Sequence, residues 1–206
     1  MWIETTLILI GFLTAARLIA QFRDSPFIGG QPHLFIALLL IYVPYLHQRI
    51  RRLDLPFFEG SFSELIRSLR CFCLTSLLLF PLFLIANHFY QSLFLETQFR
   101  EGVIPDIQRL LMTHLFLVAL PEEFFFRGWL QPLLSQKLKP LAAIVVTSLL
   151  FAFSHSVIQL AWWHFAIFFP GLVFGWLREK TGAITASVLF HTISNLLVAW
   201  IGSVYR

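Results

Sequence analysis

Long apolar stretches separated by short polar breaks dominate the chain. Seven apolar runs can be marked along it: Trp2–Ala20, His33–Gln48, Cys71–Leu95, Gln108–Leu130, Leu141–His155, Ala161–Leu177 and Ala183–Ser203. A helix needs about 20 mostly apolar residues to cross a bilayer, and the runs reach or approach that length. The breaks between them carry loop residues, as at Lys139-Pro140 and Lys180-Thr181-Gly182. The pattern predicts an all-α polytopic membrane helix bundle with about seven transmembrane helices, within a range of six to eight.

The composition agrees with this pattern. Hydrophobic residues make up 58% of the 206 residues and charged residues only 13%, whereas soluble domains are about a quarter charged. We therefore expect one integral membrane domain, residues 1–206, that is surrounded by lipid bilayer. The net charge of +4 comes from basic residues at the ends of apolar runs, so it does not indicate nucleic-acid binding. Cys71 and Cys73 are two positions apart and would face different sides of a helix, so we expect two buried thiols and no disulfide.

The basic residues also predict an orientation. Seven spans place the connecting loops alternately on two sides of the membrane. One side then carries ten Lys and Arg residues: Arg49, Arg51, Arg52, Arg67, Arg70, Arg127, Lys137, Lys139, Arg178 and Lys180. The other carries five: Arg17, Arg23, Arg100, Arg109 and Arg206. Because cytoplasmic loops are enriched in Lys and Arg, this difference predicts a cytoplasmic N-terminus in a plasma membrane of bacterial type.

The segment Ser61–Arg70 has two interpretations. Its apolar residues Phe62, Leu65, Ile66 and Leu69 recur at the spacing of one helix face. The segment would then be an interfacial helix that precedes the third span, or the first turns of one continuous third helix.

Two adjacent glutamates, Glu122 and Glu123, lie inside the fourth apolar run. Carboxylates at membrane depth are costly, so an ionisable residue there is a functional-site hypothesis by default. On a helix the two side chains point about 100° apart. Glu123 can pair with Arg127 one turn later, which leaves Glu122 free to face a cavity. The alternative is purely structural: a buried ion pair and one interfacial glutamate.

Two further polar clusters follow in apolar surroundings. His155 comes one turn after Phe151, so the imidazole and the phenyl ring share a helix face. Ser187, His191 and Asn195 are spaced by four and form a polar stripe on one helix. A His/Asn pair at this spacing can direct two donors at one point, as the stabilisation of an oxyanion requires. Hydrogen bonding between helices would explain the stripe equally well.

The three motifs together resemble the CPBP family, the intramembrane endopeptidases that include CAAX proteases, bacteriocin-processing enzymes and the Abi proteins. The pattern is Glu122-Glu123-x-x-x-Arg127, then Phe151-x-x-x-His155, then His191-x-x-x-Asn195. It spans a catalytic core at about residues 110–204. The resemblance implies an endopeptidase that cuts a membrane-anchored protein or peptide.

The resemblance also implies roles for the motif residues. Glu122 and His155 would hold the water that attacks the peptide bond. His191 and Asn195 would stabilise the oxyanion, and Glu123 with Arg127 would brace the site. A divalent metal such as zinc, held by Glu122, His155 and His191, is an open alternative to water activation by the glutamate alone.

Two other functions remain compatible with the sequence. A catalytically silent family member would act in bacteriocin self-immunity or as a scaffold, although its motifs would then be expected to degenerate. A small proton-coupled transporter would use Glu122 and the histidines as a relay, but such transporters are typically built from inverted repeats, and the sequence shows none.

Overall fold

The computed structural model describes residues 2–95, 106–158 and 160–205, and these residues form helices and no β-strand. The α-helices are α1 (Trp2–Gln21), α2 (Pro32–Arg51), α3 (Phe62–Phe94), α4 (Ile107–Met112), α5 (Leu120–Glu123), α6 (Gln131–Ser135), α7 (Pro140–Ile158), α8 (Phe168–Thr181) and α9 (Thr185–Val204). Two segments are π-helical, η1 (Thr113–Ala119) and η2 (Phe124–Leu130), and one is a 3₁₀ helix, η3 (Trp162–Ile167).

Five of the described helices, α1, α2, α3, α7 and α9, are each long and apolar enough to cross a membrane. The two other predicted runs are helical too, but each joins segments of different helix type. Residues 107–135 pass without a break from α4 through η1, α5 and η2 into α6, and residues 162–181 pass from η3 into α8. The predicted all-α membrane bundle is confirmed.

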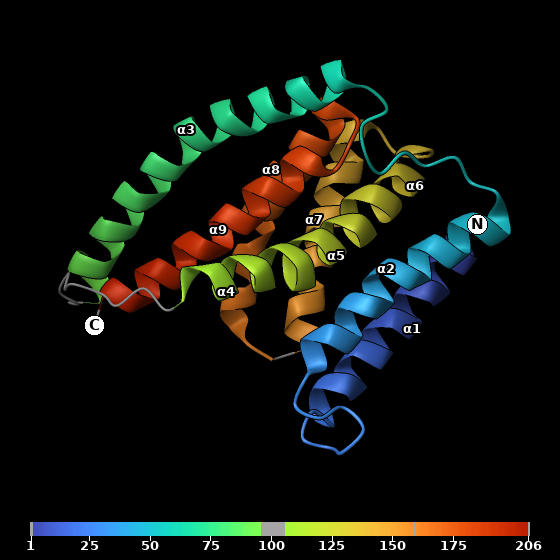
Figure 1. Ribbon diagram of the computed structural model, residues 1–206, viewed down its shortest axis with the longest axis horizontal. Helices are drawn as coiled ribbons and strands as arrows, with labels where there is room; N and C mark the ends of the chain where they lie inside the picture. The colour runs from blue at the N-terminus through green and yellow to red at the C-terminus, as the bar shows by residue number, and fades with distance from the viewer. Residues whose placement is uncertain (1, 96–105, 159, 206) are drawn as a thin grey trace.

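The third run forms one continuous helix, so residues 61–70 are not a separate interfacial element. Ser61 caps α3, because its hydroxyl oxygen accepts a hydrogen bond from the backbone N–H of Glu64 at 3.3 Å. Cys71 is partly buried and Cys73 is exposed, and both are free thiols. The expectation that both would be buried was wrong for Cys73, because α3 packs against α8 and α9 and leaves its other side uncovered (Figure 1).

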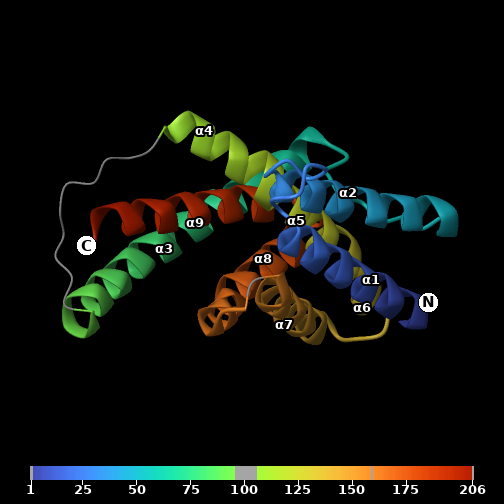
Figure 2. The ribbon, with the colours of Figure 1, turned by 90° about the horizontal axis from the view of Figure 1, so that it is seen from below.

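The helical stretch 107–135 lies in the middle of the molecule. The pair α1 and α2 lies on one side of it, and α9 with α3 lies on the other (Figure 1). The view in Figure 2 shows α7 and α8 as a separate layer beside this stretch. The hydrophobic core forms where these parts meet and is rich in aromatic side chains, among them Phe125, Phe126, Trp129, Phe151 and Phe174. Phe125, Phe126 and Trp129 belong to the same helical stretch as the two glutamates, and Phe151 and Phe174 come from α7 and α8.

The loop between α2 and α3 and the turn between α8 and α9 lie together at one end of the bundle. Arg178 donates to the carbonyl of Pro56 at 3.1 Å, and Arg67 donates to that of Thr181, also at 3.1 Å. Thr185 adds a 2.7 Å hydrogen bond to Glu59. Most of the residues that the sequence assigns to the cytoplasm belong to segments at this end.

The opposite end holds the C-terminus of α1 and the C-terminus of α7. Arg17 donates to the carbonyl of Ile158 there, at 2.8 Å. Arg100 and Arg206, which the sequence places on this side, lie outside the described residues.

Candidate active site

Both glutamates belong to α5, a four-residue α-helical segment between two π-helical ones. Pro121 lies inside the continuous helical stretch 107–135, where it removes one backbone hydrogen-bond donor. A π-helical turn contains an extra residue and so changes which side chains face a neighbouring helix, and such turns are frequent at functional sites. Glu123 is fully buried, whereas the Glu122 side chain retains 17% of its exposure. The two carboxylates therefore occupy different environments.

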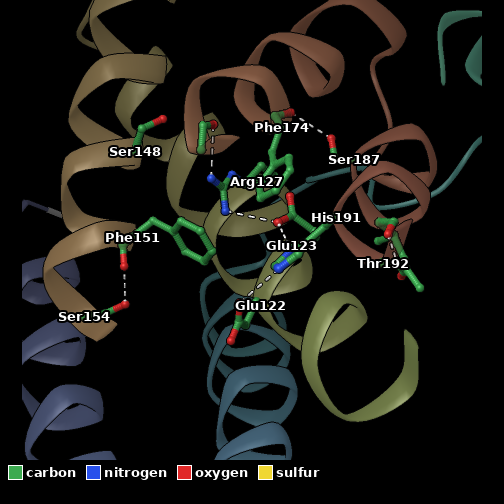
Figure 3. A network of polar contacts seen from close by, with 12 residues as sticks. Glu122, Glu123, Arg127, Ser148, Phe151, Ser154, Phe174, Ser187, His191 and Thr192 are labelled. Carbon is green, nitrogen blue, oxygen red and sulfur yellow. Dashed lines mark hydrogen bonds and ion pairs between the residues drawn. The ribbon is translucent and has the colours of Figure 1, made fainter. Parts of the chain in front are cut away.

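Glu123 lies in a closed polar network (Figure 3). Its Oε1 atom accepts from Arg127 Nη1 at 3.1 Å and lies 2.9 Å from His191 Nδ1. Arg127 is itself fully buried and also donates to the carbonyl of Gly171 at 3.2 Å. One buried carboxylate thus holds a guanidinium from its own helix and an imidazole from α9.

Aromatic rings pack against the two partners of Glu123, Arg127 and His191. The Arg127 guanidinium carbon lies 4.2 Å from the centre of the Phe151 ring and 5.1 Å from that of Phe174. Phe174 also stacks on His191, with ring centres 4.5 Å apart and an interplanar angle of 15°. The cation–π contacts offset part of the cost of burying the Arg127 charge. The Phe174 ring that stacks on His191 restricts the orientation of the imidazole.

Glu122 is faced by two imidazole rings from two different helices. His155 Nε2 of α7 lies 3.8 Å from Glu122 Oε1, and His191 Nε2 of α9 lies 3.7 Å from Glu122 Oε2. The other nitrogen of each ring is already engaged. His155 Nδ1 lies 2.9 Å from the carbonyl oxygen of Phe151, which can only accept, and His191 Nδ1 faces Glu123. Each ring therefore carries its proton at Nδ1 when neutral and presents a lone pair on Nε2 towards Glu122.

A cavity of about 180 Å³ opens on Glu122. It is lined by Phe12, His33, Ile36, Leu40, Glu122, Phe126, Ser154, His155, Ile158 and His164. The lining comes from α1, α2, the central stretch, α7 and η3, so the N-terminal helices form one wall.

None of the three residues of the α9 stripe is among the residues that line this cavity, although His191 lies beside Glu122. Asn195 follows His191 by one turn and is partly buried, and among the described residues it has no hydrogen-bond partner. Ser187 is fully buried and donates to the carbonyl of Phe174 at 2.8 Å, which ties α9 to α8. For Ser187 the structure therefore shows the helix–helix hydrogen bond that the sequence left as an alternative.

Part of the chain that contains this site matches a known protein family. Residues 105–197 match the family model described as type II CAAX prenyl endopeptidase Rce1-like, and the match includes all seven motif residues. This part of the chain is similar to that family. The resemblance seen in the motifs is thereby confirmed. No curated protein matches the chain, and no solved structure does.

The metal-ligand interpretation of this CAAX endopeptidase-like site was tested against the side-chain positions. Within residues 2–95, 106–158 and 160–205, no group of three or more His, Cys, Asp or Glu side chains is arranged to hold a metal ion. The two imidazoles instead face different oxygens of Glu122.

Sequence reasoning missed the part of this CAAX endopeptidase-like site that α8 supplies. A Cβ atom on Gly171 would lie 3.2 Å from Ser148 Cβ and 3.3 Å from Arg127 Nη2. A Cβ atom on Gly175 would lie 2.9 Å from Ile144 Cγ2. Gln131 donates to the Gly175 carbonyl at 3.0 Å, as Arg127 does to that of Gly171. The spacing Gly171-x-x-x-Gly175 was the available signal, because small residues four apart let membrane helices approach closely.

Proposed function

We propose that the Glu122 cavity hydrolyses a peptide bond of a membrane-associated protein or peptide by activating a water molecule. The match of residues 105–197 to the CAAX endopeptidase family model supports peptide hydrolysis as the reaction class. The observation that carries the finer proposal is the placement of two Nε2 atoms, of His155 and His191, at 3.8 and 3.7 Å from the two oxygens of one carboxylate. The Glu122 carboxylate and the neutral His155 ring both accept hydrogen bonds, so the space between them suits a small molecule that donates hydrogen bonds, as water does.

Glu122 is the general base in this mechanism. Its carboxylate accepts a proton from the water, and the water oxygen attacks the carbonyl carbon of the substrate. His155 orients the water through Nε2, since its Nδ1 proton is committed to the Phe151 carbonyl. Glu122 then returns the proton to the leaving amine.

His191 and Asn195 stabilise the oxyanion that forms during the attack. In its protonated form His191 donates from Nε2, and Glu123, 2.9 Å from its Nδ1, stabilises that positive charge. Asn195 supplies a neutral amide donor from the next turn of α9, and no hydrogen bond within the described residues occupies it. Glu123 and Arg127 act through His191 and are positioning residues.

The test uses purified protein in proteoliposomes with a fluorogenic prenylated CAAX peptide and its non-prenylated counterpart. We expect the wild-type protein to cleave, Glu122→Gln to be inactive, and Glu179→Gln, an exposed glutamate of α8, to behave as wild type. The amide of Gln keeps the shape of the side chain but cannot accept the proton. Full activity of Glu122→Gln would contradict the assignment.

A chelator arm tests the alternative chemistry in the same assay. Cleavage that survives chelation supports activation of water by Glu122 alone. Loss of cleavage on chelation, restored by zinc, would assign Glu122, His155 and His191 to a metal instead. Absence of cleavage by the wild-type protein with both peptides would favour a silent family member.

We also propose that the N-terminus and the segment Arg49–Arg70 face the cytoplasm of a bacterial-type plasma membrane. The ten-to-five distribution of Lys and Arg supports this orientation. In a background with Cys71 and Cys73 replaced by alanine, a membrane-impermeant thiol reagent added to intact cells should label Asp24→Cys and spare Arg49→Cys. The reverse pattern would overturn the orientation.

A further inference from the structure

A second concave site lies between the first turns of α1 and the last turns of α2, and none of its residues lines the Glu122 cavity. It is a groove of about 610 Å³. Six of its nine lining residues are apolar: Ile3, Leu7, Ile8, Val43, Leu46 and Ile50. The other three, Glu4, His47 and Arg51, are polar and interact with one another.

The polar residues form a charged pair with a buried imidazole beside it. Arg51 Nε donates to Glu4 Oε1 at 2.7 Å, and the side chains keep 56% and 29% of their exposure, so both remain accessible. His47 Nε2 lies 3.5 Å from the same Glu4 oxygen and makes no hydrogen bond with the described residues.

The proton position on His47 follows from its other neighbour. The indole N–H of Trp129 can only donate, and it donates to His47 Nδ1 at 3.0 Å. The neutral ring must therefore carry its hydrogen on Nε2. His47 is 94% buried, since only 6% of it is exposed, and it lines the groove with this unused N–H. An unpaired buried donor is costly, so a groove that presents one favours a ligand that supplies an acceptor.

We propose that this groove binds a phospholipid with a primary ammonium headgroup, of the phosphatidylethanolamine class. The apolar residues accommodate an acyl chain. Arg51 and the Nε2–H of His47 take the phosphate oxygens, and the Glu4 carboxylate takes the ammonium group. The site offers one carboxylate beside one guanidinium, which matches a zwitterion better than a purely anionic headgroup.

The place of the groove in the bundle agrees with a lipid ligand. The first turns of α1 and the last turns of α2 are the ends of two membrane-spanning helices, so the charged residues lie at the depth of the headgroups. The apolar residues around them are strongly exposed, with Ile3 at 79% and Ile50 at 76%. These side chains face acyl chains, while the pair Glu4–Arg51 faces the polar layer.

Lipid retention measured by native mass spectrometry tests this proposal. The detergent-purified protein is mixed with equal amounts of phosphatidylethanolamine, phosphatidylcholine and phosphatidylglycerol that share the same acyl chains. We expect phosphatidylethanolamine to be retained on the order of tenfold more than either competitor, because its ammonium group can donate charge-assisted hydrogen bonds to the Glu4 carboxylate. Phosphatidylcholine lacks the N–H donors, and phosphatidylglycerol lacks the cation.

Variants locate the preference in the groove. Glu4→Gln should abolish the tenfold preference, because the ammonium group loses its carboxylate. Arg51→Gln should lower the retention of all three lipids, because each carries the phosphate. Arg49→Gln, an exposed arginine of the same turn that does not line the groove, should change neither. Melting temperatures in lipid-free detergent show whether each variant is folded. Equal retention of the three lipids by the wild-type protein, a preference for phosphatidylglycerol, or an unchanged preference in Glu4→Gln would each overturn the proposal. The result does not depend on catalysis, since Glu122→Gln should show the wild-type preference.

Discussion

The two sides of α5 differ although the glutamates that define them are adjacent. On the Glu123 side, Arg127, His191, Gly171 and two phenylalanine rings enclose the carboxylate completely. On the Glu122 side the carboxylate meets a cavity and two imidazole nitrogens that lie beyond hydrogen-bond distance. On the first side Glu123 Oε1 is held by two protein partners, while Oε2 is buried with no hydrogen-bond partner among the described residues. On the second side the carboxylate faces a cavity and has bonding capacity left for a substrate and a water molecule.

This difference separates stability from reactivity within one turn of helix. A buried charge with good partners is strongly destabilising only when one partner is removed. A carboxylate at a cavity contributes little to the fold, so it can be replaced without unfolding the chain. Substitutions on the two sides should therefore differ in their effects on stability and on activity.

The largest effect is expected when the two glutamates are exchanged for glutamine separately. Glu122→Gln should reduce the cleavage rate by about 10²–10⁴, the usual contribution of a general base, with little change in melting temperature. Glu123→Gln should lower the melting temperature clearly, because it leaves Arg127 buried without a carboxylate. Rates in proteoliposomes and thermal unfolding in detergent give both values. Equal destabilisation by the two changes would remove the distinction between the sides.

Arg127→Ala is expected to cost about 3–5 kcal/mol of stability as well as activity. The change leaves Glu123 buried without its guanidinium and opens the space between Phe151 and Phe174. Expression level and denaturant-induced unfolding measure the loss, and Arg49→Ala, an exposed arginine, is the control. A variant as stable as the wild type would show that the network does not support the fold.

Asn195→Ala should lower kcat/KM by about 10²–10³, the cost of removing one oxyanion donor. Its melting temperature should stay at the wild-type value, since among the described residues its side chain has no hydrogen bond to lose. Ser194→Ala is the matched control, because it removes the neighbouring polar side chain of α9, whose hydroxyl bonds to its own helix at Phe190. Equal rates for the two variants would exclude Asn195 from the reaction.

Gly171→Ala should produce the smallest effect, about 1–3 kcal/mol of destabilisation, as expected for overpacking. The added methyl group would press on Ser148 and on the Arg127 guanidinium. Gly202→Ala in α9 is the control, because a Cβ atom there would have no neighbour within 4 Å. The melting temperatures of the two variants measure this difference in stability. Equal melting temperatures would show that α7 and α8 can move apart without loss of stability.

The sequence predicts the local geometry of the site better than its assembly. Glu123 and Arg127, and Phe151 and His155, are each one turn apart, and helix geometry alone brings them together. The contact between His191 and Glu123 joins residues 68 positions apart, so it depends on how α9 packs. The π-helical segments were also not predicted, since one additional residue in a turn leaves no mark in the hydrophobic pattern.

The size of the Glu122 cavity limits the form in which a substrate can arrive. Pockets that enclose a drug-sized ligand measure roughly 300–1,000 Å³, and this one measures about 180 Å³. An α-helix with its side chains is about 10–12 Å across, so a membrane-spanning helix would have to unwind before its backbone reached Glu122. Segments that are already extended, such as a chain terminus beside a lipid anchor, avoid that unfolding cost. Selection by this enzyme would then depend on how easily a segment uncoils, before any side chain is recognised.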